Sequence, residues 1–168
     1  MDDVRWLSAE EQEIWRAYLS ASVAFSAHID RQMRQDSGMP MAYYEILVRL
    51  SEAPRRRLRM SELADVSLSS RSRLSHAVAA LERNGWVERR PADGDRRGWV
   101  CALTEDGYAA LAAAAPGHVT TVREHIFDVL TPEQLATLRD IGLAISAGLS
   151  QECAAARAED EQADPYAG

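Results

Sequence analysis

The chain has 168 residues, 46% of them hydrophobic, and a formal net charge of −7. This length suits one domain with appended helices, and the hydrophobic fraction supports a packed core, which excludes a wholly disordered chain. No apolar run reaches about 18 residues, so no membrane span is expected, and the acidic start differs from a secretory signal. These features favour the cytoplasm as the compartment.

Charge is distributed unevenly along the chain. Residues 53–98 contain eleven arginines and six acidic residues, a net charge of +5, so the remainder carries −12. Phosphate groups respond to the local rather than the total charge, and this block therefore indicates a local anionic partner. All 19 basic residues are Arg, so their clustering is more informative than the choice of Arg over Lys.

The first third of the chain has a helical pattern. In residues 9–36 apolar side chains recur at steps of three and four, which is typical of a long amphipathic helix. Gly38 and Pro40 end this helix, and residues 41–52 predict a second, shorter one. A short edge strand is expected at residues 58–60.

Two short helices are expected next, over residues 61–68 and 70–84. The second carries a narrow apolar stripe of Leu74, Val78 and Leu81, and its other faces hold Arg, Ser and His. Two helices joined by a serine-containing turn, with such a stripe, are typical of a helix-turn-helix.

A hairpin follows directly. Residues 86–89 and 99–103 predict two strands, and PADGDRRG (91–98) reads as a long loop between them. The hairpin and its basic tip favour a DNA-binding winged helix over ordinary helix packing.

The last third of the chain is again helical. A helix begins near residue 105, and Pro116 is expected to kink or divide it. Thr131 to Gln134 form a capping-box start for the final helix, and residues 155–168 predict a disordered acidic tail. The outer helices have broad apolar stripes, which a homodimer would cover.

The chain resembles the MarR (multiple-antibiotic-resistance regulator) family. Arg97 is followed after five residues by Leu103-Thr104 and, two residues later, by Gly107, which is the family's spacing. Other matching segments are Leu63-Ala64, Ser70 to Leu74, Leu81 to Arg89, and Asp95 to Arg97. The resemblance covers residues 10–152. It implies a homodimeric transcription regulator, a repressor in our interpretation, that acts on double-stranded DNA and associates with the nucleoid.

The implied fold class is mainly α with a small β-hairpin, a winged helix-turn-helix with N- and C-terminal dimerisation helices. Residues 1–40 and 105–154 would form the dimerisation region, and residues 41–104 the DNA-binding domain. In the resemblance, helix 70–84 enters the major groove and a wing at residues 90–98 enters the minor groove. The resulting candidate DNA-binding residues are Ser70, Arg71, Arg73, Ser75, His76, Arg89, Arg90, Asp95, Arg96 and Arg97.

Each candidate also has a simpler interpretation. Ser70 is equally well explained as a helix N-cap, and His76 as a solvated surface residue. Asp95 cannot favourably face a phosphate, so its expected role is to hold an arginine or the turn backbone. The run Arg55 to Arg57 is either a solvated basic loop or a further DNA contact.

The resemblance also implies a small aromatic or lipophilic effector bound between the dimer helices and the winged helix. Candidate lining residues mix aromatic surface with hydrogen-bonding groups, although aromatics at helical spacing usually form core: Trp15, Tyr18, His28, Tyr43 and His118.

The remaining chemistry is sparse. The redox-sensing branch of the family carries a cysteine in the first helix, and residues 9–36 have none. Cys101 is expected to be an inert core thiol and Cys153 lies near the C-terminus. No metal-ligand cluster, cofactor motif or catalytic nucleophile–base pair is visible, so an enzyme is not expected. The alternative is a winged-helix module that binds protein instead of DNA.

Overall fold

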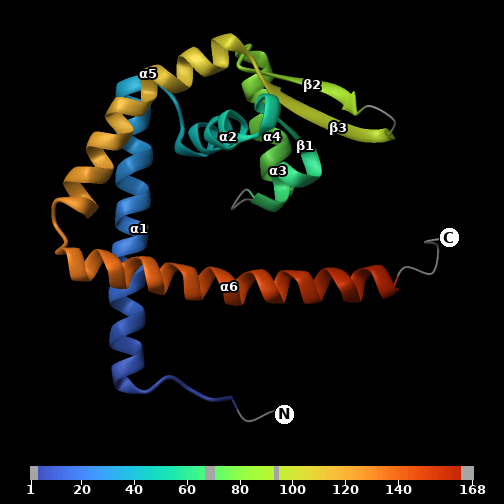
Figure 1. Cartoon of the computed structure of the whole chain (residues 1–168). Coiled ribbons are helices and arrows are strands. Elements are labelled where there is room, and N and C mark those ends of the chain that lie inside the picture. The colour runs from blue at the N-terminus through green and yellow to red at the C-terminus, as the bar shows by residue number, and fades with distance from the viewer. Residues whose placement is uncertain (1–3, 67–70, 93–94, 164–168) are drawn as a thin grey trace. The chain divides into compact units, whose positions relative to one another are not determined.

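The computed structural model describes the backbone of residues 4–66, 71–92 and 95–163, and the side chains of residues 4–65, 72–92 and 98–149. It divides into two compact units, Met1–Val122 and Arg123–Gly168, which are described separately. The fold is mainly helical with one small antiparallel sheet, which confirms the expected class (Figure 1). No helix in the described part of the chain is long and apolar enough to cross a membrane.

Two helices open the first unit. Helix α1 (Ala9–Ser37) begins with a capping box in which the Ser8 Oγ accepts from the Glu11 N–H, and it ends at Gly38 with a φ of 69°. Helix α2 (Met41–Glu52) has the predicted bounds. The carboxylate of Asp30 on α1 accepts the first N–H of α2, that of Met41, at 2.9 Å, so the two helices are joined where α2 starts.

The helix-turn-helix consists of α3 (Met60–Val66) and α4 (Arg71–Arg83). Ahead of it lie a 3-10 turn (Pro54–Arg56) and the short strand β1 (Arg57–Arg59), which confirms the expected edge strand. The predicted stripe is also confirmed, because Leu74, Val78 and Leu81 are buried in the core.

The three strands form one antiparallel sheet in the order β1-β3-β2. Strand β2 (Val87–Ala92) pairs with β3 (Asp95–Leu103) in the register Val87↔Leu103 and Arg89↔Cys101. The predicted long loop over residues 91–98 is therefore wrong, because both strands extend into it. The strands were predicted from their hydrophobic residues, and these end where the core ends. The backbone hydrogen bonds between β2 and β3 continue farther along the projecting hairpin (Figure 1).

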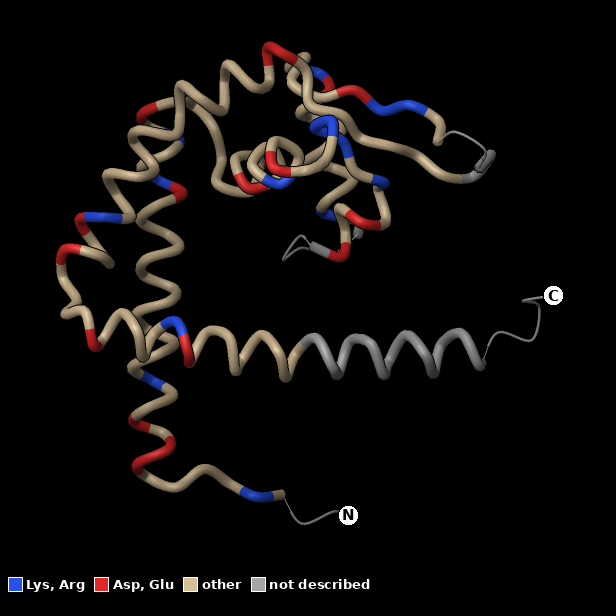
Figure 2. The backbone as a smooth tube through the Cα atoms, in the orientation of Figure 1, with Lys and Arg blue, Asp and Glu red and all other residues tan. Residues whose placement is uncertain are grey.

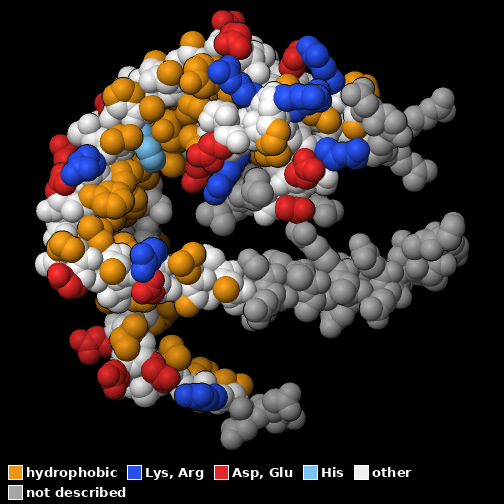
Figure 3. Space-filling view, in the orientation of Figure 1, with side chains coloured by type: hydrophobic (Ala, Val, Ile, Leu, Met, Phe, Trp, Pro, Cys, Tyr) orange, Lys and Arg blue, Asp and Glu red, His pale blue; other side chains and the backbone are white. Residues whose placement is uncertain are grey.

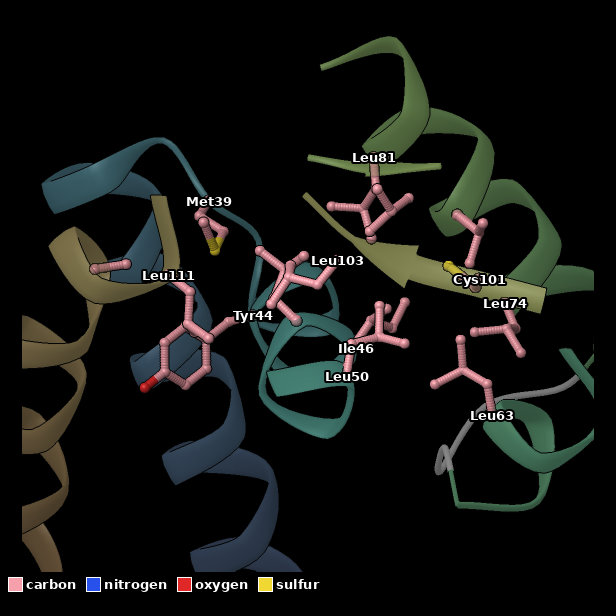
Figure 4. Close-up of a cluster of buried hydrophobic side chains, with 14 of the residues drawn as sticks. Met39, Tyr44, Ile46, Leu50, Leu63, Leu74, Leu81, Cys101, Leu103 and Leu111 are labelled. Atoms are coloured by element: carbon pink, nitrogen blue, oxygen red, sulfur yellow. The ribbon is translucent and has the colours of Figure 1, made fainter. Parts of the chain in front are cut away.

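One hydrophobic core holds the first unit together. Figure 4 shows side chains from α2, α3, α4, β3 and α5 meeting there, with the thiol of Cys101 among leucines. Cys101, Leu47, Leu50, Leu63 and Leu81 are fully buried. Because each element contributes its apolar face to this cluster, the helix-turn-helix, the sheet and α5 hold fixed positions relative to one another.

Helix α5 (Glu105–Val122) packs along α1 and α2 (Figure 1). It continues through Pro116, so of the two expected outcomes, a kink or a division of the helix, the division is wrong. Pro116 leaves the carbonyl of Ala112 without its usual donor, and both residues are exposed, so water can satisfy that carbonyl. The regular helix ends instead at a π turn, Arg123–Phe127, in the second unit.

The second unit contains this π turn and helix α6 (Pro132–Ala163). The predicted capping box is confirmed: the Thr131 N–H donates to the Gln134 Oε1 at 2.9 Å, and the Gln134 N–H donates to the Thr131 Oγ1 at 3.3 Å. Helical backbone reaches Ala163, beyond residue 155, where the sequence suggested an irregular tail. Ala, Arg, Glu and Gln dominate that stretch and are good helix formers.

Candidate nucleic-acid interface

Helix α4 presents its polar faces on two sides of the buried stripe. Arg73, Ser75 and His76 are exposed near its N-terminal end, as the sequence predicted. Ser70 and the side chain of Arg71 lie outside the described residues. Side chains at i, i+3, i+4 and i+7 share a helix face, so the exposed residues divide between two flanks of α4.

Each flank borders a groove. The α2–α4 groove, with a volume of about 710 Å³, includes Arg73, His76 and Arg83 on its α4 side. The wing groove, about 580 Å³, lies between α4 and the hairpin and is lined by Arg59, Met60, Ser61, Ser75, Glu82, Arg89, Gly98 and Trp99. Helix α4 therefore borders a hollow on each side of its exposed surface.

Strand alternation explains how the hairpin faces α4. Val87 and Arg89 lie on the same face of β2, opposite Leu103 and Cys101 of β3. Trp99 follows on that face, but it is half exposed and borders the wing groove. On the side that faces α4, the hairpin is therefore buried from its base as far as Cys101, and nearer the tip the side chain of Trp99 is exposed.

A carboxylate of α4 binds the first arginine of strand β2, just before the wing. The Glu82 Oε1 accepts the backbone N–H of Arg89 at 3.0 Å, and the Oε2 accepts the Arg89 Nε–H at 2.8 Å. The hydrogen bond from the Arg89 guanidinium holds the pKa of Glu82 below its usual value, and the bond to Glu82 raises the pKa of Arg89. Both groups are therefore charged and paired.

The other predicted basic contacts differ in their surroundings. Arg90 is exposed and pairs with Glu88 at 2.6 Å, and Figure 2 shows the acidic residue of β2 followed by its arginines. The backbone of Asp95, Arg96 and Arg97 belongs to β3, but their side chains lie outside the described residues. The sequence prediction for these three wing residues stays a prediction.

Within the basic run before β1, Arg56 is engaged in the fold. Its guanidinium lies 3.9 Å from the ring centroid of Tyr108 and pairs with Glu105 at 3.2 Å, both on α5. Arg55 and Arg57 are exposed. The contact of Arg56 with α5 favours a structural role for this arginine over a DNA contact.

The Leu-Thr-x-x-Gly segment joins the wing to α5 and to the end of α4. The Thr104 Oγ1 donates to the Gly85 carbonyl at 2.7 Å and accepts the Gly107 N–H at 2.9 Å. The Thr104 N–H donates to the Trp86 carbonyl. The threonine therefore caps α5 and binds the turn that ends α4, which explains why this motif accompanies the wing.

The structure separates the five predicted effector residues. Of the described residues, Tyr43 and His118 line the α2–α4 groove together with Tyr44, whereas Trp15, Tyr18 and His28 lie on α1 outside it. The His118 ring stacks on Tyr44 with centroids 4.5 Å apart, and burial lowers the pKa of His118. Its buried Nδ1 has no hydrogen-bond partner among the described residues.

The rings of Trp15 and Tyr18 lie 5.9 Å apart on an exposed face of α1. They belong to a surface rather than to a groove.

The cysteine and metal expectations can be compared with the described side chains. Cys101 is fully buried, which confirms a core thiol, and this burial raises the pKa of the thiol to about 12, so its inertness stays a prediction. The side chain of Cys153 lies outside the described residues. Among the described residues, His, Cys, Asp and Glu form no cluster able to hold a metal ion.

The sequence analysis did not recognise the roles of two residues in this region, Glu82 and Trp99. Glu82 was counted only as a charge, because nothing in linear order links an acid on a helix to an arginine seven positions later on a strand. Trp99 was read as an ordinary strand residue. Its position two residues beyond Cys101, on the same face, indicates that it lies where the core ends.

Comparison with solved structures gives close matches to the whole arrangement. Sco3205, a MarR family transcriptional regulator from Streptomyces coelicolor solved in complex with DNA, is 52% identical with a TM-score of 0.84. The match covers 89% of this chain and 93% of that one. AbsC, a MarR family transcriptional regulator from the same organism, is 39% identical with a TM-score of 0.80, covering 87% of this chain and 98% of AbsC.

Sequence comparison agrees with these matches. The family model described as MarR family matches residues 37–98, which include α2 to most of the hairpin. The transcriptional repressor MprA of Escherichia coli K12 is 32% identical over 85 residues, 51% of this chain and 48% of MprA. Since a regulator of this family is more than half identical to this chain over nearly its whole length and has the same fold, the chain belongs to the MarR family of transcriptional regulators.

Proposed function

We propose that this regulator is a homodimer that binds double-stranded DNA at a pseudo-palindromic operator and represses transcription in the cytoplasm, on the nucleoid. The observation that carries the proposal is its similarity to Sco3205, which was solved in complex with DNA. The repressor MprA supports the sign of regulation. A two-fold dimer predicts two half-sites about one helical turn, roughly 10 base pairs, apart.

Helix α4 would read bases in the major groove while the hairpin reaches the minor groove. The proposed DNA-binding residues are those of the sequence analysis except Arg89, which is bound to Glu82. They are Ser70, Arg71, Arg73, Ser75 and His76 on or beside α4 and Arg90, Arg96 and Arg97 on the wing, with Asp95 holding an arginine or the turn backbone. Exposure of Arg73, Ser75 and His76 supports the α4 contacts. Arginine pairs bidentately with guanine, and serine reaches bases or phosphates, which fits the residues on the two exposed flanks of α4.

A second copy of the chain would cover the exposed apolar surface of the terminal helices. In the first unit the N-terminal half of α1 exposes Ile14, Trp15, Tyr18, Leu19 and Val23. In the second unit α6 exposes Leu138, Ile141, Leu143, Ile145 and Leu149. Figure 3 shows such hydrophobic side chains on the surface. Patches of this kind on a regulator support dimerisation through residues 1–40 and 105–154.

The test is a selection of bound fragments from genomic DNA by the purified full-length protein. The recovered duplex is then titrated at several salt concentrations beside a random duplex of equal length. Phosphate-driven binding lowers log K by about 0.9 per contacted phosphate for each unit of log salt. A protein-interaction module would recover no common sequence and would show no steep salt dependence.

The α2–α4 groove supports a response to a small aromatic effector. Tyr43, Tyr44 and His118 supply aromatic surface there, and the unpartnered Nδ1 of His118 offers a hydrogen-bonding group. Arg73 and His76 border the same groove, so a ligand in it would compete with their DNA contacts. A panel of phenolic acids should release the operator from the wild type and not from His118→Ala, and equal release from both would exclude this groove.

A further inference from the structure

The Glu82–Arg89 pair is a denser contact than an ordinary surface ion pair. Both carboxylate oxygens of Glu82 are used, one by the backbone N–H of Arg89 and the other by its guanidinium. Both side chains are partly buried, with 27% and 35% exposed. A contact that includes the backbone of β2 fixes the strand itself to α4, and not only a flexible side chain.

The Glu82–Arg89 pair lies where the packed part of the hairpin ends. On the α4-facing side of the hairpin, Cys101 opposite Arg89 is fully buried, whereas Trp99, two residues farther along β3, is half exposed beside the wing groove. Among the described side chains, the pair is therefore the outermost polar bond between α4 and the hairpin. The wing tip extends from this point.

The pair also changes the expected role of Arg89. A guanidinium that shares its charge with Glu82 at 2.8 Å offers little net attraction to a phosphate. Arg90 forms an exposed ion pair with Glu88, which leaves β2 with no net charge once Glu82 is included. Strand β2 thus adds little net positive charge beside the recognition helix, in contrast to the sequence prediction that Arg89 is a DNA-binding residue.

We propose that Glu82 is a positioning residue for operator binding: by holding Arg89 it fixes the angle between the wing and the recognition helix, and neither residue of the pair contacts DNA. This inference rests on the proposed DNA-binding function. An operator presents its major and minor grooves at a fixed separation, so a wing that pivots relative to α4 loses simultaneous contact with both.

The experiment is a double-mutant cycle with the full-length protein and the duplex recovered by genomic selection. Glu82→Gln and Arg89→Gln should each weaken specific binding by about tenfold, and the double variant should bind no worse than either, because all three lose the same contact. The salt slope should stay near that of the wild type. Arg73→Gln, a proposed phosphate or base contact, should lower the slope by about 1.8 for a dimer if it binds phosphate.

Two controls separate positioning from folding. Glu105→Gln breaks an ion pair of α5 with Arg56 and should leave affinity unchanged, and thermal denaturation reports whether each variant folds. In an Arg97→Ala background, which already lacks a wing contact, Glu82→Gln should cost less than about twofold, since its effect acts through the wing. A general loss of stability would weaken binding equally in both backgrounds.

The outcomes distinguish the alternatives. If Glu82→Gln binds as well as the wild type or better, the positioning role is wrong. If Arg89→Gln lowers the salt slope as a phosphate contact does, the positioning role is also wrong and Arg89 is a phosphate ligand. If the wild type itself recovers no common site and shows no salt-dependent binding, the proposed function fails and this inference fails with it.

Discussion

Gly107 lies directly against the backbone of Trp86. A Cβ atom built on Gly107 would overlap the Trp86 carbonyl oxygen and would lie 2.8 Å from both the Trp86 carbonyl carbon and the Leu103 Cδ1. Gly107→Ala should therefore force the first turn of α5 away from the end of α4. We expect a loss of about 1–3 kcal/mol in unfolding free energy, measured by urea denaturation.

Gly85→Ala is the matched comparison, because it lies in the same junction but has open space around it. Gly85 has a φ of 73°, so alanine there meets only backbone strain, of about 1 kcal/mol. Gly107→Ala should be the more damaging of the two. The reverse order would mean that the junction tolerates separation of α5 from α4.

Substituting Thr104 by alanine and by serine should separate the role of its hydroxyl group from that of its methyl group. Thr104→Ala removes the acceptor for the Gly107 N–H and the donor to the Gly85 carbonyl, and it should cost about 1–2 kcal/mol in unfolding free energy. Thr104→Ser retains the hydroxyl and should lose much less. Equal losses in a denaturation series would assign the effect to the methyl group rather than to the hydrogen bonds.

Local patterns predicted much of this fold because local chemistry determines it. The spacing of apolar residues, with Gly38 and Pro40 before it and Pro54 after it, predicted both ends of α2 correctly. The capping box of the last helix was predicted from the spacing of Thr131 and Gln134 alone. Pairing of β2 with β3 beyond the core depends on backbone hydrogen bonds that any residue can make, so the sequence underestimated both strands. The division expected at Pro116 does not occur, because the carbonyl freed by this proline is on an exposed residue, where water can reach it.

The sequence predicted which types of residue form the candidate site, but it did not predict which of these residues contact one another. The exposed face of α4 followed from the burial of Leu74, Val78 and Leu81. Three contacts depend on tertiary packing and could not be read from the sequence. They are the bond of Arg89 to Glu82, the stack of Arg56 on Tyr108, and the groove that Tyr43 shares with His118. Charge clustering alone therefore does not show which arginines, such as Arg89 and Arg56, already have partners within the fold.

Cys101 should be unreactive while the protein is folded. Its burial raises the thiol pKa from 9.0 to about 12, so at pH 8 only about one thiol in 10⁴ is ionised. In a Cys153→Ser variant, iodoacetamide should label the protein in urea and not under native conditions, as mass spectrometry would show. Rapid native labelling would contradict the buried position.

The same shift gives a pH dependence of stability. The folded pKa is raised above the unfolded value of 9.0, so the contribution of Cys101 is fully present below pH 9 and is lost as the pH rises toward 12. Cys101→Ala should remove this component from the alkaline limb of the stability curve. An identical alkaline limb in the variant would show that other groups cause the decline.

Arg56 should affect stability rather than DNA binding. The turn Pro54–Arg56 places Arg55 and Arg56 at φ values of 56° and 53°, and the stack of Arg56 on Tyr108 holds this strained turn against α5. Arg56→Gln should lower the unfolding free energy by about 1 kcal/mol and leave the salt slope of DNA binding unchanged. Arg55→Gln removes the same charge from an exposed side chain and should alter stability less.

The wing should contribute to operator binding through Arg97. Arg97→Ala should weaken binding of the selected duplex while the thermal midpoint and the dimer, measured by analytical ultracentrifugation, stay as in the wild type. If its guanidinium enters a narrow A·T-rich minor groove, the loss should be larger on duplexes with such a tract at the wing position than on G·C-rich ones. Unchanged affinity at fixed salt would remove the wing from recognition and leave α4 as the reader of the operator.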